Sequence, residues 1–282
     1  MDSSIKYISQ LNLPELIVRT NRSIHPPIRY TGSKFRAAKY IIPHLQKVNY
    51  DEYREPFLGC GAIFFATPTS KFSWLNDVDN DLITTFRVIA DDRERNWLIK
   101  KISKITPNRE LFYKLRYKKA KTERDIAYRY FVINRTAYGG IMHNPNWGFH
   151  EYKSVQPNKW PELIERSSLK LREATKITSL DFKEVITASP QGQKVFLFID
   201  PPYFKADQKR AYAHSFRETD HYNLLDLLKS TKYKFCLTYD NCEEIKKMYA
   251  WANIHEVEWM YHTSNSNKAT RKIGKELIIT NY

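Results

Sequence analysis

The sequence predicts an α/β fold with a doubly wound, Rossmann-like parallel sheet, and two observations support this prediction. Residues 195–199 (VFLFI) are continuously apolar, as is typical of a strand buried on both faces of a parallel sheet. Elsewhere, short apolar strands alternate with helical segments and with turns that carry glycine or acidic residues. Ligands of such sheets bind outside the carboxyl ends of the strands, so the residues that follow each strand are candidates for a functional site.

The first 90 residues predict an arm followed by the start of this sheet. Residues 1–27 show no periodic pattern and are interpreted as a loosely packed arm. Residues 35–47 have helical spacing that Pro43 interrupts, because proline removes a backbone donor. The segments that follow are a strand at 53–57, a glycine turn, a strand at 72–75 and a helix at 80–90.

The pattern changes after residue 90. Residues 91–130 are helical in pattern, with 13 basic and 6 acidic residues, and residues 134–160 are rich in Gly, Asn and Pro, which is typical of loops or a short hairpin. Strands are expected again at 176–180, 195–200, 234–239, 254–259 and 276–280, with helices at 181–188, 220–229 and 243–251. We therefore expect one α/β domain (28–90 and 171–282) that carries a mostly helical insertion (91–170).

The composition favours a polyanionic partner. The chain has 282 residues, 42% of them apolar, and a formal net charge of +15, which favours nucleic acid or an acidic membrane surface. No apolar run reaches the ~18–20 residues of a membrane span, and the amino terminus lacks the apolar core of a signal peptide. The three cysteines form no CxxC pair, which favours a reducing cytoplasm and argues against zinc or a disulfide framework.

The tetrapeptide Asp200-Pro201-Pro202-Tyr203 directly follows the apolar strand. Because the two prolines lack backbone N–H groups and end the strand, Asp200 is expected at the carboxyl end of a buried strand. The alternative is a simple turn in which Asp200 acts as a cap and Tyr203 covers the core. Five apolar residues that run straight into this tetrapeptide favour a ligand site.

Four stretches occur in an order that resembles a known family: RYTGSK (29–34), EPFLGCG (55–61), LNDVD (75–79) and DPPY (200–203). Over roughly residues 28–282, the chain resembles the Dam-like, alpha-group DNA adenine-N6 methyltransferases. The resemblance implies a Rossmann-like S-adenosylmethionine-dependent methyltransferase fold, in which the insertion is a target-recognition domain. It also implies S-adenosyl-L-methionine as the methyl donor, double-stranded DNA as the partner and no metal.

In this family the matching residues surround the cofactor. The resemblance implies that Lys34 binds the methionine carboxylate and that Asp77 accepts hydrogen bonds from the ribose hydroxyls. Asp79 is the alternative ribose ligand, and either acid could instead be a helix N-cap. Asp181 would accept from the adenine amino group, with helix capping as its alternative. The glycine turn lacks a third glycine, since Phe64 occupies that place, which argues against a dinucleotide. The implied cofactor-binding residues are Tyr30, Lys34, Glu55, Phe57, Gly59, Gly61, Asp77, Asp181, Phe182 and Asp200.

The chemistry is expected at the tetrapeptide. The lone pair on the exocyclic nitrogen of adenine is delocalised into the ring, so two acceptors on its N–H bonds are needed to free it. The Asp200 carboxylate and the Pro201 carbonyl can be these acceptors, and Tyr203 offers a stacking face worth ~1–3 kcal/mol. Tyr212 or Phe216 is expected as a second wall for a base that is rotated out of the duplex, with a place in the core as the alternative for both. The expected catalytic residues are Asp200, Pro201, Pro202 and Tyr203.

The insertion is expected to read DNA. Residues 111–121 (LFYKLRYKKAK) contain five basic and no acidic residues, which favours phosphate contacts. NRTAYGGIMHNPNW (134–147) resembles the recognition hairpin of the family, but His143 stands where readers of GATC usually carry Arg. The polar loop before residue 274 is either a DNA-facing loop or a flexible linker. The expected DNA-binding residues are Arg116, Lys118, Lys119, Asn134, Arg135, Tyr138, His143 and Asn144.

The sequence is thus interpreted as a site-specific, adenine-specific DNA methyltransferase. We expect it to act in the cytoplasm of a prokaryotic cell or virus-infected host, as a monomer or weak dimer. It would serve either as the partner of a cognate restriction endonuclease encoded nearby or as an orphan methylase. An RNA adenine methyltransferase and a DNA-binding protein without catalytic activity are the alternatives.

Overall fold

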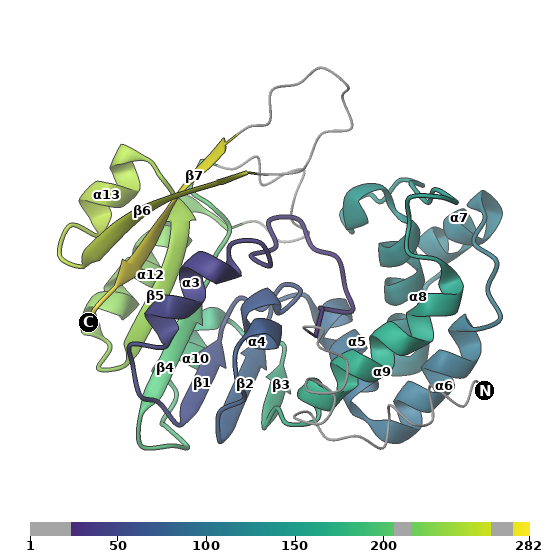
Figure 1. The fold of residues 1–282 in the computed structure, drawn as a ribbon, viewed down its shortest axis with the longest axis horizontal. Helices are drawn as coiled ribbons and strands as arrows, with labels where there is room; N and C mark the ends of the chain where they lie inside the picture. The colour runs from purple at the N-terminus through teal and green to yellow at the C-terminus, as the bar shows by residue number, and fades with distance from the viewer. Residues whose placement is uncertain (1–23, 206–215, 261–272) are drawn as a thin grey trace.

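The structure is a computed structural model that describes residues 24–205, 216–260 and 273–282. Most of the expected arm, Tyr212 and most of the polar loop before residue 274 lie outside these ranges. At its centre is a seven-stranded sheet (Figure 1). Its strands are β1 (Glu52–Glu55), β2 (Phe72–Asn76), β3 (Lys176–Thr178), β4 (Val195–Ile199), β5 (Lys234–Asp240), β6 (Asn253–Met260) and β7 (Ile273–Thr280).

The strand order is β3-β2-β1-β4-β5-β7-β6, which confirms the predicted Rossmann-like α/β fold. Strands β1 to β5 pair in parallel, whereas β7 lies antiparallel between β5 and β6. The chain winds outward from β1 through β2 to β3, then crosses to β4 and winds the other way. The connections after β1 and β4 therefore diverge, and such a switch point opens a crevice at the carboxyl edge of a parallel sheet.

Both faces of the sheet are covered, as the apolar run at 195–199 predicts. In β4, Phe196 and Phe198 pack with Ile41 and Ile63 of the helices on one face. Alternate residues of the same strand pack on the other face, with side chains of α10, α12 and α13. The first face carries α3 (Ala38–Leu45), α4 (Ala62–Ala66) and α5 (Asn80–Ala90), and the second α10 (Phe182–Thr187), α12 (Glu218–Ser230) and α13 (Glu243–Met248).

Four further helices gather beside the β3 edge, on the right of Figure 1. Each of the first three begins at a residue whose side chain accepts a backbone N–H of the first turn: Asp91, Asn108 and Thr122. The fourth was not expected from the sequence and is anchored by the fully buried Trp160, whose ring meets Phe131 edge-on at 5.8 Å. The helices are α6 (Asp92–Ile102), α7 (Arg109–Tyr117), α8 (Glu123–Thr136) and α9 (Trp160–Leu171).

Two boundaries differ from the sequence prediction for physical reasons. Strand β1 ends at Glu55 and not at residue 57, because Pro56 has no N–H for the ladder. Helix α8 continues to Thr136, so Asn134 and Arg135 are helical and do not belong to the expected loop. The loop after α8 closes as a short hairpin, in which Tyr138 N donates to the Asn146 carbonyl at 2.8 Å.

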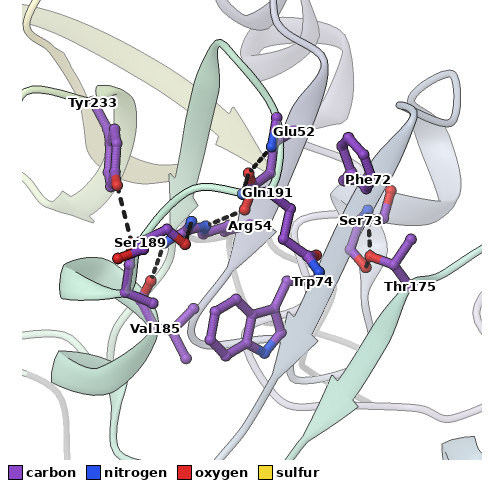
Figure 2. A network of polar contacts seen from close by, with 12 residues as sticks. Glu52, Arg54, Phe72, Ser73, Trp74, Thr175, Val185, Ser189, Gln191 and Tyr233 are labelled. Atoms are coloured by element: carbon purple, nitrogen blue, oxygen red, sulfur yellow. Dashed lines mark hydrogen bonds and ion pairs between the residues drawn. The ribbon is translucent and has the colours of Figure 1, made fainter.

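A buried ion pair closes the amino-terminal edge of the sheet (Figure 2). Arg54 Nε lies 2.7 Å from Glu52 Oε1, and both side chains are fully buried. The guanidinium also donates to the carbonyls of Val185, Ala188 and Ser189, at 2.8–3.0 Å, and so fixes the end of α10. Glu52 Oε2 accepts the N–H groups of residues 191 and 192, at 2.6 and 2.7 Å. The network joins β1 to the turn that precedes β4.

We expect Arg54→Met to lower the free energy of unfolding by about 3–5 kcal/mol, because it leaves the Glu52 carboxylate buried without its cation. Urea unfolding of the purified chain measures this change. The control is Arg172→Met, which breaks a partly exposed pair with Asp92 (3.4 Å) and should cost about 1 kcal/mol or less. Equal effects of the two substitutions would contradict a structural role for the buried pair.

Candidate active site

A pocket lies at the carboxyl ends of β1, β2 and β4, where the strand order reverses. Four loops that are far apart in the sequence line it: residues 30–34, 55–63, 77–79 and 180–182. Asp200, Pro202 and Phe216 complete the wall on the β4 side. The pocket therefore occupies the position that the fold predicts for a ligand.

The glycine turn after β1 contributes Gly59 to the pocket lining. Gly59 and Gly61 have φ of +49° and +71°, in the left-handed region that favours glycine. A Cβ on Gly59 would lie 3.1 Å from the Tyr30 ring, which packs directly on this turn. The close packing of Tyr30 on Gly59 brings the segments RYTGSK and EPFLGCG together.

The structure distinguishes the two acids after β2. Asp79 is the N-cap of α5 and accepts from the N–H groups of Asp81 and Leu82. Asp77 is buried and braces the glycine turn: its Oδ2 accepts Gly59 N at 2.8 Å, and its Oδ1 accepts Asp79 N at 3.0 Å. Both acids line the pocket. Each acid thus accepts two backbone N–H groups, and the assignment of the ribose hydroxyls to Asp77 stays a prediction.

Asn76, which the sequence reasoning did not single out, holds the loops of the pocket together. It is fully buried at the end of β2, and its Nδ2 donates to the carbonyls of Pro56 (3.1 Å) and Leu180 (3.0 Å). Its Oδ1 accepts Leu180 N at 2.9 Å and the Thr178 hydroxyl at 2.7 Å. An amide at the end of an otherwise apolar strand (FSWLN) was the available signal.

A cluster of three aromatic rings forms part of the pocket wall. Phe182 stacks on Phe57, with ring centroids 5.2 Å apart, and Phe216 meets Phe57 edge-on at 5.6 Å. Asp181 lines the pocket while it caps α10, through a bond from Lys183 N at 2.8 Å. This cluster offers a flat apolar surface of the kind that a purine ring can contact.

Asp200 lies at the point where these walls meet. Lys34 Nζ approaches its Oδ1 at 2.9 Å, and the Thr238 hydroxyl donates to the same oxygen at 2.6 Å. The Lys34 ammonium also lies 4.7 Å from the centre of the Tyr203 ring. Neither of the two contacts uses Oδ2. The carboxylate is thus held in place through Oδ1.

The turn after Asp200 is held from the side of β5. Asp240, the last residue of β5, accepts Phe204 N at 3.0 Å and Lys205 N at 3.1 Å. The Tyr203 hydroxyl donates to Glu276 of β7. Thr238, Asp240 and Glu276 were not predicted as site residues, because nothing local in the sequence links them to residues 200–205.

Glu55 is the most strongly buried acid of the pocket. Desolvation raises the pKa of this carboxyl to about 8, and the nearby Asp200 acts in the same direction. The hydrogen bond from the Tyr53 hydroxyl (2.7 Å) and the charge of Lys170 oppose this rise in the pKa. Glu55 therefore holds a proton at neutral pH and can offer a donor as well as an acceptor to a ligand.

Most of the predicted site residues come together in this pocket, and three do not reach its lining. Gly61 initiates α4, Pro201 is buried, and Tyr203 lies beside the pocket against Lys34. The predicted residues that do line it are Tyr30, Lys34, Glu55, Phe57, Gly59, Asp77, Asp181, Phe182, Asp200 and Pro202.

Two of the predicted DNA-binding residues are buried. Asn134 is fully buried and bonded to the backbone N–H and carbonyl of Arg29, at 2.9 and 2.7 Å, so its amide holds two chain segments together and is not available to DNA. Arg135 is 8% exposed, and desolvation lowers the pKa of its guanidinium to about 10. Neither side chain is presented to a base edge here, because the helix that carries them packs inward.

The other six lie at the surface of the insertion. Lys118 and Lys119 are exposed at the end of α7, and Tyr138 is 53% exposed in the hairpin. Asn144 has φ of +46° at the hairpin turn. The full set is Arg116, Lys118, Lys119, Tyr138, His143 and Asn144.

The described part of the chain shows neither a metal-binding cluster nor a helix fit to span a membrane. Within the ranges that the structure describes, no three His, Cys, Asp or Glu side chains are grouped so that they could hold a metal ion. Similarly, none of the helices described here combines the length and apolarity needed to cross a bilayer.

The fold and pocket define a Rossmann-like α/β protein with a candidate ligand site at the switch point of its sheet. Residues 30–263 match the family model of the D12 class N6 adenine-specific DNA methyltransferases. The chain belongs to this family, and it is an adenine-specific DNA methyltransferase. DNA is accordingly its substrate, and a methyl donor its cosubstrate.

Curated relatives resemble the chain over most of its length. The chain is 26% identical to Type II methyltransferase M1.LlaDCHI of Lactococcus lactis subsp. cremoris, an alignment that covers 95% of this chain and 99% of the relative. It is 25% identical to Type II methyltransferase M.CviBI of Paramecium bursaria Chlorella virus NC1A (91% and 99% covered). It is likewise 25% identical to Type II methyltransferase M.MjaIII of Methanocaldococcus jannaschii (92% and 99% covered).

The raised pKa of Glu55 predicts a pH-dependent stability. The folded chain keeps the Glu55 proton up to about pH 8, whereas an unperturbed carboxyl releases it near 4.5. The wild type should therefore lose stability as the pH rises through this interval, relative to Glu55→Gln, by up to about 1.4 kcal/mol per pH unit. Urea unfolding between pH 5 and 8 measures the difference. Glu243→Gln, at an exposed carboxyl of α13, should follow the wild type, and parallel curves for wild type and Glu55→Gln would contradict the burial argument.

Proposed function

We propose that the chain transfers a methyl group from S-adenosyl-L-methionine to the N6 atom of an adenine that has been rotated out of duplex DNA at a specific site. The observation that carries this proposal is Asp200, which is fixed by Lys34 and Thr238 at the mouth of the pocket with Oδ2 unused by either. The target amine lies inside the base stack of a duplex, so base rotation is needed to reach this carboxylate.

The donor set of the pocket fits S-adenosyl-L-methionine. Asp77 would accept from the ribose hydroxyls, and Phe182 with Phe57 would contact the adenine ring. Gly59 lines the pocket, and a Cβ at this position would lie 3.1 Å from the Tyr30 ring. Lys34 would meet the methionine carboxylate, although it is paired with Asp200 here, so binding would require it to share or exchange partners. When bound, this cofactor supplies an activated methyl group on a sulfonium.

The residues of this chain then supply alignment and acceptors. Asp200 Oδ2 would accept one N–H of the target amine, and the Pro201 carbonyl would accept the other. These two bonds would favour a tetrahedral nitrogen, whose lone pair is no longer delocalised into the ring. Tyr203 would stack on the base, and Pro202 keeps the turn from continuing as strand. Because the methyl group is already activated, holding the amine in line with it provides much of the rate.

We propose further that the chain is a Dam-like, alpha-group member. The order of its segments supports this assignment: RYTGSK, the glycine turn and the two acids after β2 precede the helical insertion, and DPPY follows it. In this proposal residues 28–90 and 171–282 form the catalytic domain and residues 91–170 the target-recognition domain. The surface residues of the insertion named above, from Arg116 to Asn144, would contact the DNA.

The names of the relatives support a role in a restriction-modification system, because all three are Type II methyltransferases. We propose that a cognate restriction endonuclease cuts the same site, and that the chain acts as a monomer or weak dimer. Methylation-aware sequencing of DNA from cells that express the chain tests base identity and recognition site together. Modification of any atom other than adenine N6 would contradict the proposed chemistry.

Replacing the acceptor should stop transfer without releasing the DNA. We expect Asp200→Ala to lower the rate of methyl transfer by at least roughly 100-fold, because it removes an acceptor that is aligned in the transition state, while DNA affinity stays within a few-fold. Tritiated methyl incorporation and a DNA mobility-shift assay measure the two quantities. Asp226→Ala, at an exposed acid of α12, is the matched control. Full turnover by Asp200→Ala would rule out the acceptor role.

The basic end of α7 should contribute affinity without sequence preference. In Lys118→Ala/Lys119→Ala, the slope of log affinity against log salt should fall by up to about 2, since each phosphate contact contributes about 0.9. Fluorescence anisotropy with specific and unrelated duplexes at several salt concentrations measures this. The control is Lys229→Ala/Lys232→Ala, outside the insertion. A loss confined to one DNA sequence would show that these lysines read bases.

A further inference from the structure

Glu276 lies in a position where the fold would favour an apolar residue. It is on β7 and is 1% exposed, and the next three residues of the strand, Leu277, Ile278 and Ile279, belong to the two cores of the sheet. Its backbone partner on β5 is Asp240, which holds the turn after Asp200. Figure 1 shows β7 running beside β5 at the edge of the parallel sheet.

The Glu276 carboxyl is bonded to the residue that follows Asp200-Pro201-Pro202. Its Oε2 accepts the Tyr203 hydroxyl, and the Tyr203 ring lies under the Lys34 ammonium. Its Oε1 has no hydrogen-bond partner among the residues that the structure describes. A buried carboxyl oxygen without a partner is unfavourable, and native proteins contain few of them.

The electrostatic surroundings confirm that this burial is unfavourable. Desolvation raises the pKa of Glu276 to about 7, and Asp200 and Asp240 push it in the same direction, while Lys34 and the Tyr203 hydroxyl oppose the rise. Titratable groups with perturbed pKa values cluster at functional sites, and Glu276 lies beside the candidate site at Asp200. The bond to Tyr203 is the contact through which it can act.

We propose that Glu276 is a positioning residue, which fixes the plane of the Tyr203 ring through the tyrosine hydroxyl. The inference rests on the proposed function, in which Tyr203 stacks on the rotated adenine. Asp240 holds the backbone immediately after Tyr203, and Glu276 holds the tip of its side chain, so β5 and β7 together fix the stacking surface before the base arrives. A ring that is already ordered loses less freedom when the base binds.

The test compares four variants of the full chain: Glu276→Ala, Glu276→Gln, Tyr203→Phe and the double variant Glu276→Ala/Tyr203→Phe. The measured quantities are kcat and KM for unmodified plasmid DNA, with tritiated S-adenosylmethionine as the methyl source. Cofactor affinity by calorimetry and the thermal unfolding midpoint are measured beside them. Glu243→Ala, at an exposed carboxyl of α13, is the matched control.

We expect Glu276→Ala and Tyr203→Phe each to lower kcat/KM for DNA by roughly 10- to 100-fold, because each frees the ring. The double variant should be no worse than either single variant, since both remove the same bond. Glu276→Gln should keep most of the activity, because its amide oxygen accepts the same hydroxyl. Cofactor affinity should change less than kcat/KM in all four variants.

Three results would overturn the positioning role: wild-type activity in Glu276→Ala, additive losses in the double variant, or a Glu276→Gln that is as impaired as Glu276→Ala. If Glu276→Ala does not fold, Tyr203→Phe decides, because wild-type activity without the hydroxyl would also overturn it. A wild-type chain that transfers no methyl group would defeat the proposed function and this inference together. An active wild type with an unaffected Glu276→Ala would defeat the inference alone.

Discussion

The constraint on which this molecule depends is that its buried strands end in polar residues at one edge of the sheet. Glu55 ends β1, Asn76 ends β2 and Asp240 ends β5, while Asp200 directly follows β4. The packing of an apolar strand does not require a polar residue at its end. Burying such a residue costs hydration, and for Glu55 this cost appears as a raised pKa. Because parallel strands bring their carboxyl ends to the same edge of the sheet, residues separated by up to 185 positions in the sequence build the same site.

Much of this arrangement could be predicted because its signals are local. The apolar run into Asp200-Pro201-Pro202 fixes a strand, its end and a carboxylate within ten residues, and the glycines after β1 fix a turn. The residues that hold these parts are different. Asn76, Thr238 and Glu276 act through partners that lie 20 to 104, 38 and 73 positions away, and no periodic pattern carries that information.

In the insertion, the local sequence predicts a DNA contact for two residues that the fold buries. Asn134 and Arg135 lie in a polar segment, NRTAYGG, that resembles a recognition loop, yet both are buried: Asn134 is bonded to Arg29, 105 positions earlier, and Arg135 is 8% exposed. Polarity alone could not distinguish an amide that contacts DNA from one that joins two segments. Trp160 likewise starts a helix and packs edge-on against Phe131 of another helix, a contact that no local pattern in the sequence signals.

The two edges of the sheet differ in how completely their charges are matched. At the amino-terminal rim, the buried groups of Arg54 and Glu52 are satisfied by each other, by backbone carbonyls and by backbone N–H groups. Their hydrogen-bonding groups are therefore already used within the protein. At the opposite, carboxyl rim, Glu276 keeps one oxygen without a partner among the described residues, and Asp200 uses only one of its two oxygens on Lys34 and Thr238. The same strands therefore carry fully paired buried charges at one end and a buried acceptor that is still unpaired at the other.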